Sequence, residues 1–180
     1  MIPTESQAKQ LWEKYHLPEK KRIHVALVAR VALFLAAECE KNIPGCHINI
    51  PLLKAAAYLH DIDKVIPRRS GEQHPDTAVR VLREEGMDEV ADIVQTHSLH
   101  AILDPGIAPK TWEQKLLYLA DKMVKFEIIT VDERFRLWND EQLPRDVQYI
   151  LDTSYPLVKA LEKEILDSIA IKPQDIARLA

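Results

Sequence analysis

Apolar residues recur at helical spacing along almost the whole of this 180-residue chain. No segment shows the sustained alternation of apolar and polar residues that is typical of a half-buried strand, so we expect no sheet. The pattern predicts an all-α protein, and an apolar content of 47% is enough for a buried core. The expected helices cover residues 6–15, 23–41, 51–61, 75–85, a segment that starts at 88, 111–124, and a region from about 144 that Pro156 is expected to break in two.

The sequence shows no sign of a division into domains. Repeats, low-complexity segments and linkers are all lacking, so we expect one domain over residues 1–180. The net charge of -4 gives no general basic field, and we therefore expect neither a nucleic acid nor a membrane as partner. A charged N-terminus without a signal segment, the lack of a long apolar run, and two cysteines (Cys39 and Cys46) that make no disulfide scaffold favour a cytoplasmic protein.

Five ionisable side chains fall on the apolar faces of the expected helices, because residues three and four apart share one face. Asp121, for example, follows Leu117 by four residues and precedes Val124 by three. Taken singly, an inward histidine is more often bonded to a carbonyl group, and an inward aspartate is more often paired with arginine. Taken together, all five are satisfied by one buried cation. The five are His24, His60, Asp61, His97 and Asp121.

The chemistry of these side chains narrows the choice of cation. Imidazole and carboxylate ligands without a thiolate suit iron, manganese, cobalt, nickel, zinc or magnesium, and the lack of a cysteine ligand argues against a structural zinc site. Lys64 lies three residues after Asp61, and Arg68 and Arg69 follow in a loop. Positive side chains beside a metal suit phosphate oxygens, although Arg69 is equally well explained as a solvated loop residue.

The ordered set His24, His60-Asp61 and Asp121 resembles the H…HD…D signature of the HD-domain superfamily of metal-dependent phosphohydrolases. The sequences AAAYLHDIDK and LLYLADK strengthen the resemblance, which covers the chain from His24 to about Arg134. It implies a helical bundle with its core at about residues 20–135, onto which the helices of residues 144–180 pack. It also implies that the signature residues bind a metal in the core of the bundle.

Two further histidines extend what the resemblance implies. Family members with histidines between the HD pair and the last aspartate bind two metals, and His74 and His97 occupy these places. We therefore expect two divalent ions, with Asp61 as the bridging carboxylate and a shared activated water. Lys64 matches a family lysine that resembles a phosphate contact, so Asp61 and Lys64 are the expected catalytic residues.

One position of the motif leaves the subfamily open. The motif commonly reads HDIGK, whereas Asp63 stands in place of the glycine in this chain. The whole pattern is similar to bacterial HD-type hydrolases of diadenosine tetraphosphate, to small HD nucleotidases, and to HD proteins of unassigned substrate.

Arg68 and His100 are expected to add contacts to the substrate, together with Lys64. His100 follows His97 by three residues. A third metal ligand, a general acid, a substrate contact and an ordinary histidine near water all remain open for it. Arg134 either reaches a phosphate or pairs with a neighbouring acid.

The expected function is hydrolysis of a phosphoester or phosphoanhydride in a nucleotide or a similar small phosphorylated metabolite, by in-line attack of the activated water. Two alternatives are kept: a module that senses a nucleotide without turnover, and a di-iron oxygenase built on the same ligands. Lys64 and the arginine-containing loop favour an anionic substrate over the oxygenase. A homodimer is one of two ways to cover the long C-terminal amphipathic region, the other being packing on the same chain.

Overall fold

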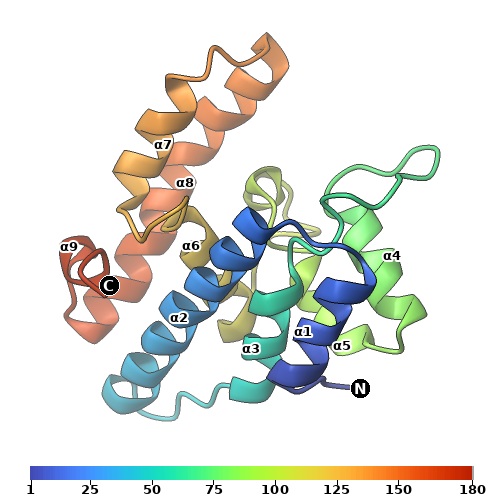
Figure 1. The fold of residues 1–180 in the computed structure, drawn as a ribbon. Helices are drawn as coiled ribbons and strands as arrows, with labels where there is room; N and C mark the ends of the chain where they lie inside the picture. The colour runs from blue at the N-terminus through green and yellow to red at the C-terminus, as the bar shows by residue number, and fades with distance from the viewer. Residues whose placement is uncertain (180) are drawn as a thin grey trace.

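The computed structural model describes residues 1–179, and helices dominate this range (Figure 1). An isolated antiparallel bridge between Val124 and Ile128 is the one β pairing in the described residues. The prediction of an all-α fold is therefore confirmed. The elements are α1 (Glu5–Lys14), α2 (Glu19–Asn42), α3 (Ile50–Leu59), α4 (Asp76–Glu84), α5 (Asp88–Val94), the 3-10 helix η1 (Leu99–Leu103), α6 (Trp112–Lys122), α7 (Val131–Asn139), α8 (Arg145–Ile169) and α9 (Pro173–Ile176).

Side-chain caps fix where several of these helices begin. At the start of α6, the Thr111 hydroxyl accepts a hydrogen bond from the Gln114 backbone N–H, while the Gln114 side chain accepts one from the Thr111 N–H. Thr4 and Gln7 form the same reciprocal pair at the start of α1. Because the first N–H groups of a helix have no partner within it, such pairs stabilise the helix end.

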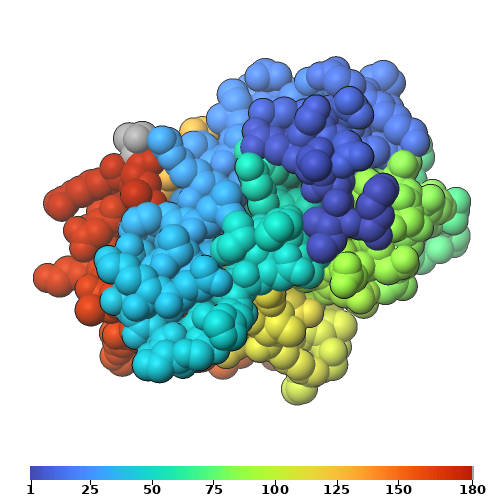
Figure 2. All heavy atoms as spheres, turned by 90° about the horizontal axis from the view of Figure 1, so that it is seen from below, coloured from blue at the N-terminus to red at the C-terminus, as the bar shows by residue number. Residues whose placement is uncertain are grey.

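The long helix α2 lies at the centre of the fold and packs against α3, α6 and α8 (Figure 1). Helix α3 contacts α1 and α5 as well, and α4 packs on α5. Viewed from below, the C-terminal helices form one side of the molecule and the α4–α5 region the opposite side (Figure 2). Within residues 1–179, no helix combines the length and the apolar character needed to cross a membrane.

The expectation that Pro156 breaks the C-terminal helix is wrong. Helix α8 continues through it from Arg145 to Ile169. The proline is exposed, whereas Leu151 and Val158, one on each side of it, are buried. Apolar packing on both sides of the proline holds α8 together, and this offsets the missing backbone hydrogen bond.

Helix α7 lies in a segment for which the apolar pattern gave no helix. The Thr130 hydroxyl accepts a hydrogen bond from the Glu133 N–H and caps its start. Phe135 anchors the helix, with its ring centroid 5.2 Å from that of Trp138 and 5.0 Å from that of Tyr155 on α8. The pair α7–α8 extends from one end of the molecule (Figure 1).

Candidate metal centre

The six side chains that the sequence singles out as metal ligands meet in one place. His24 lies on α2, His60 and Asp61 directly follow α3, His74 precedes α4, His97 follows α5, and Asp121 lies near the end of α6. Five of the six, all except the fully buried His60, line a cavity of about 200 Å³. Three overlapping sets of potential ligand atoms each lie within 4.8 Å of one another: His24, His60 and Asp121; His60, Asp61 and His97; and Asp61, Asp63 and His74.

The Asp61 carboxylate lies at the middle of the cluster. Its Oδ1 atom is 3.9 Å from His60 Nε2, 3.7 Å from His74 Nε2 and 4.0 Å from His97 Nε2. Its Oδ2 atom is 3.9 Å from His24 Nε2. The two oxygens therefore face different histidines, which is the position that the sequence-based expectation of a bridging carboxylate requires.

On one side of Asp61, two histidines converge on the second aspartate of the signature. Asp121 Oδ1 lies 3.1 Å from His24 Nε2 and 3.4 Å from His60 Nε2. On the other side, His74 Nε2 lies 3.0 Å from His97 Nε2. The cluster thus has two halves that share Asp61.

Main-chain carbonyl groups orient three of the four histidine rings. The Nδ1 atom of His60 lies 2.8 Å from the Ala57 carbonyl oxygen, and that of His97 lies 2.6 Å from the Val94 carbonyl oxygen. The Nδ1 atom of His24 lies 3.3 Å from the Lys125 carbonyl oxygen. Because a carbonyl only accepts, each Nδ1 carries a proton, and each ring therefore presents its Nε2 atom to the centre of the cluster, where loss of any second proton frees a lone pair for a metal.

Asp63 orients the fourth ring. Its two carboxylate oxygens lie 3.1 and 2.9 Å from His74 Nδ1, so this nitrogen donates and His74 Nε2 is left with a lone pair. The glycine that is common at this position in the motif has no side chain to do this. The aspartate that left the subfamily open therefore has a direct contact inside the cluster.

The donor set fits divalent metal ions. His60 Nε2 is buried and has no hydrogen-bond partner within the described residues. His74 and His97 direct two unprotonated nitrogens at each other at 3.0 Å. A buried lone pair without a donor is costly, and nitrogens bound to one ion at about 2.0–2.1 Å can lie this close together. A shared cation therefore resolves both features.

The protonation states of Asp61 and His97 are those that metal binding needs. Burial and the neighbouring His60 lower the pKa of His97 well below its usual value, which keeps the ring neutral. Burial acts to raise the pKa of Asp61, but His60 and Lys64 outweigh it and hold this pKa well below the usual range. Neutral imidazole and ionised carboxylate are the forms that bind metals. Burial acts to lower the pKa of His60, but Asp61 and Asp121 outweigh it and raise this pKa, so a metal ion bound at His60 displaces a proton.

Positive side chains surround the carboxylates. Lys64 Nζ lies 2.9 Å from Asp61 Oδ1, as the spacing of the two residues predicts, and Lys21 Nζ lies 2.9 Å from Asp61 Oδ2. Lys122 is 1% exposed, and its ammonium group donates to Asp121 and to the His97 carbonyl oxygen. Arg134 also lines the cavity. Lys21 and Lys122 were not predicted as site residues from the sequence, which left two roles open for Arg134.

Two expected substrate contacts lie apart from the cavity. Arg68 is exposed in the loop between α3 and α4 and does not line it. His100 is on η1, half-buried, with its Nε2 atom 3.4 Å from the Ser98 hydroxyl, and does not line it either. Burial lowers the pKa of His100 below its usual value. The structure therefore separates these two residues from Lys64, which does line the cavity.

Glu72 holds the loop that carries Arg68. Its carboxylate accepts hydrogen bonds from the Arg69 N–H and the Thr77 hydroxyl, both at 2.8 Å, and pairs with Arg80 at 2.5 Å. The bonds from Arg80 and Arg69 lower the pKa of Glu72 to about 2. The loop is thus fixed close to His74 by charge rather than by apolar packing.

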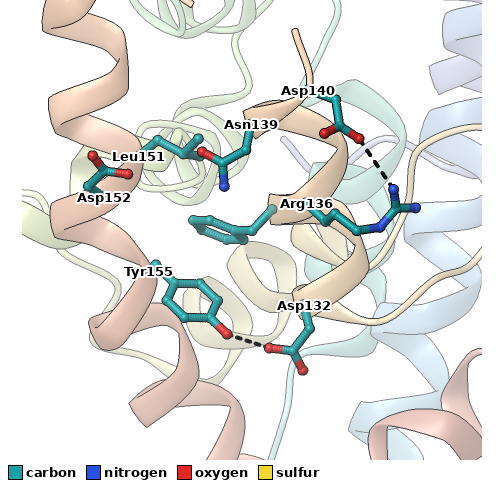
Figure 3. Close-up of a pocket in the computed structure, with 8 residues that line it drawn as sticks. Asp132, Arg136, Asn139, Asp140, Leu151, Asp152 and Tyr155 are labelled. Atoms are coloured by element: carbon teal, nitrogen blue, oxygen red, sulfur yellow. Dashed lines mark hydrogen bonds and ion pairs between the residues drawn. The ribbon is translucent and has the colours of Figure 1, made fainter. Parts of the chain in front are cut away.

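A second cavity lies away from the cluster, between α7 and α8 (Figure 3). Two of its acidic residues already have partners nearby. Asp132 accepts a hydrogen bond from the Tyr155 hydroxyl at 2.6 Å, and Asp140 forms an ion pair with Arg136 at 3.2 Å. No histidine lines it. This cavity therefore offers none of the ligands that gather around Asp61.

The fold and the cluster define an all-helical protein with a buried histidine–carboxylate centre suited to divalent metals. Residues 22–124, more than half of the chain, match the family model described as HD domain. The chain belongs to the HD domain family, which consists in general of metal-dependent phosphohydrolases. The matched range contains all six expected metal ligands. No curated protein and no solved structure matched the chain.

Proposed function

We propose that the protein hydrolyses a phosphoester or phosphoanhydride bond in a small phosphorylated metabolite of the nucleotide class, with two divalent metal ions bound around Asp61. The observation that carries the proposal is the position of the cluster. Four histidine Nε2 atoms lie within 4.0 Å of the buried Asp61 carboxylate. Asp61 lines a cavity together with Lys21, Lys64, Lys122 and Arg134. Ligands for cations and donors for phosphate oxygens thus share one small space.

The residues divide into those that hold metal and those that hold phosphate. We assign His24, His60 and Asp121 to one ligand group. We assign His74 and His97, whose Nε2 atoms lie 3.0 Å apart, to the other, with Asp61 common to both groups. Bound there, divalent ions supply an activated water and offset negative charge on the phosphoryl oxygens. Asp61 orients this water toward phosphorus.

Lys64 and Arg134 are the residues that we assign to the phosphoryl group. Both line the cavity, and Lys64 Nζ lies 3.4 Å from the ring nitrogens of His74. Their N–H groups donate to the phosphoryl oxygens as charge develops there. The water oxygen bonds to phosphorus, the bond from phosphorus to the leaving oxygen breaks, and solvent protonates the leaving group.

Metal analysis combined with a hydrolysis screen tests this function. We expect purified protein to bind divalent metal, and the manganese- or iron-loaded protein to release phosphate from part of a nucleotide panel. His60→Ala and Asp61→Asn should each lower kcat/KM at least a hundredfold, since loss of a residue that only supports a ligand already costs about 10–100-fold. His47→Ala is the control, because His47 is exposed and lies outside the cavity.

Three results bear on the alternatives. Absence of hydrolysis across the panel by metal-loaded protein contradicts the proposed function. Tight nucleotide binding in that same inactive protein indicates a sensing module. Oxygen consumption by iron-loaded protein indicates the oxygenase.

A further inference from the structure

A third cavity, distinct from the one between α7 and α8, adjoins the metal cluster. It has a volume of about 380 Å³ and shares four lining residues with the cluster cavity: Lys21, His24, Arg134 and Trp138. A volume of this size lies within the range of pockets for small organic ligands, about 300–1,000 Å³. We call it the basic cavity because of the side chains described next.

Positive charge dominates the lining of the basic cavity. Lys20, Lys21, Lys125 and Arg134 contribute four cations, against one acid, Glu141. Lys125 Nζ pairs with Glu141 at 3.0 Å, whereas Lys20 has no ion-pair or hydrogen-bond partner for its ammonium group within residues 1–179. Since the chain as a whole has a net charge of -4, this concentration of positive charge is local.

Arg134 connects the two cavities. Its guanidinium group lies 4.1 Å from the centre of the Trp138 ring, which holds it by a cation–π contact. Its Nε atom is buried and has no hydrogen-bond partner within the described residues. Burial lowers the pKa of Arg134 below its usual value. A desolvated donor of this kind needs an acceptor, and an anion placed between the two cavities supplies one.

The position of Lys125 is coupled to the metal cluster through the backbone. Lys125 lies in the turn that the bridge between Val124 and Ile128 closes. Its carbonyl oxygen accepts from His24 Nδ1 at 3.3 Å, while its side chain lines the basic cavity. One residue therefore orients a metal ligand and places a cation in the adjoining space.

We propose that the basic cavity binds a second phosphoryl group of the substrate, next to the one that is cleaved. Lys20 and Lys125 are the donors to this group, and Arg134, which lines both cavities, lies between it and the phosphoryl group that is cleaved. The inference rests on the proposed function, because that function places the scissile phosphate at the cluster. It narrows the substrate class to compounds with at least two neighbouring phosphoryl groups.

The test compares two probes that contain no P–O–P or P–O–C bond and therefore cannot be hydrolysed there. Methylenediphosphonate has two phosphoryl groups, and methylphosphonate has one. The variant is Lys20→Gln/Lys125→Gln, since both residues line the basic cavity and not the cluster cavity. The matched control, Lys41→Gln/Lys163→Gln, changes the net charge equally at side chains that are 71% and 75% exposed. Calorimetry on metal-loaded protein gives the Kd of each probe for the unchanged protein and for each variant.

We expect the Lys20/Lys125 variant to bind methylenediphosphonate about tenfold or more weakly than the unchanged protein does, from the loss of two charge-assisted contacts. Its Kd for methylphosphonate should stay within about threefold, and the control variant should change neither. The single variant Lys20→Gln should show a smaller shift in the same direction.

Two results overturn the inference. In one, the Lys20/Lys125 variant binds both probes more weakly by the same factor. In the other, this variant binds methylenediphosphonate as tightly as the control variant does. Neither result depends on turnover. If the nucleotide panel is hydrolysed while the probes show no difference, the inference fails and the proposed function stands. If the probes differ while no compound is hydrolysed, the proposed function fails and the basic cavity is a diphosphate-binding site.

Discussion

Asp63 accepts the Nδ1 proton of His74, a role that main-chain carbonyl groups have for the other three histidine rings. It is 7% exposed and bonds His74 Nδ1 through both of its oxygens. His74 lies in a loop just before α4, without a helix to fix its ring. The half of the cluster that contains His74 therefore depends on this one carboxylate.

Asp63→Ala should weaken the binding of one metal ion about 10–100-fold and leave the other nearly unchanged, because His74 loses the acceptor that sets its tautomer. Metal content per chain, measured by elemental analysis after dialysis against graded chelator, gives the result. Asp63→Asn, which keeps an oxygen acceptor, should weaken the binding of this ion less, and His74→Ala, which removes the ligand itself, should weaken it at least as much as Asp63→Ala does. Full retention of both ions in Asp63→Ala would contradict the assignment.

Some residues of the site could be predicted from the sequence, and others could not. The inward histidines and aspartates were predictable, because helical spacing places them on apolar faces. The burial of Lys122 was not. Its ammonium group is satisfied by Asp121, by the His97 carbonyl oxygen and by the Tyr118 ring, 4.0 Å away. Asp121 and Tyr118 lie on α6 together with Lys122, but the His97 carbonyl oxygen belongs to another segment, and local spacing does not reveal this partner.

Helix α8 shows how packing overrides local preference at the scale of an element. A proline within a helix removes one hydrogen bond and clashes with a carbonyl one turn before. The hydroxyl groups of Thr153 and Ser154 donate to nearby carbonyl oxygens, those of Tyr149 and Leu151, at 2.6 and 3.2 Å. The stripe that α8 buries against η1 and α2 keeps it continuous.

Pro156→Ala should therefore raise the free energy of unfolding by about 1–3 kcal/mol, since alanine restores the backbone N–H while the more flexible unfolded chain offsets part of the gain. Chemical denaturation with matched slopes measures the change. Lys163→Ala, at an exposed position of the same helix, serves as the control and should lie within about 0.5 kcal/mol of the unchanged protein. A loss of stability in Pro156→Ala would show that the proline favours the native helix.

The elements differ in how clearly the sequence predicted them. Helix α6 was predictable, because a capping threonine precedes a long apolar stripe. Helix α7 was not, because Val131 and Phe135 are its only buried residues and the charged side chains between them are equally typical of a loop. Its stability comes from the contact of Phe135 with Tyr155 on α8, which no local pattern reveals.

Considered as a whole, the molecule builds its cluster from segments spread over nearly 100 residues of sequence. The ligands come from α2, the ends of α3 and α5, the start of α4, and α6. Metal bound at the cluster would join all of these elements. The basic cavity likewise combines Lys20 and Lys21 with Lys125 and Arg134, and such long-range proximity could not be predicted from local spacing.

Removal of metal should therefore lower the melting temperature of the whole fold. At a free metal concentration of about 100 times Kd, binding contributes about 2.7 kcal/mol, which corresponds to a shift of about 5–10 °C for a chain of this size. Thermal unfolding with and without chelator measures it. His60→Ala, which lacks a ligand of one of the two ions, should show a smaller shift on addition of chelator, and an equal shift in both proteins would assign it to metal bound elsewhere.

The carbonyl groups that orient His24, His60 and His97 have a consequence for how this sequence can diverge over evolution. Every amino acid supplies a carbonyl oxygen, so Ala57, Val94 and Lys125 can be replaced by other residues while the three rings stay aligned. Lineages can therefore change much of the sequence around these histidines and keep one half of the cluster. The half that needs the Asp63 side chain is the one that a single substitution can remove.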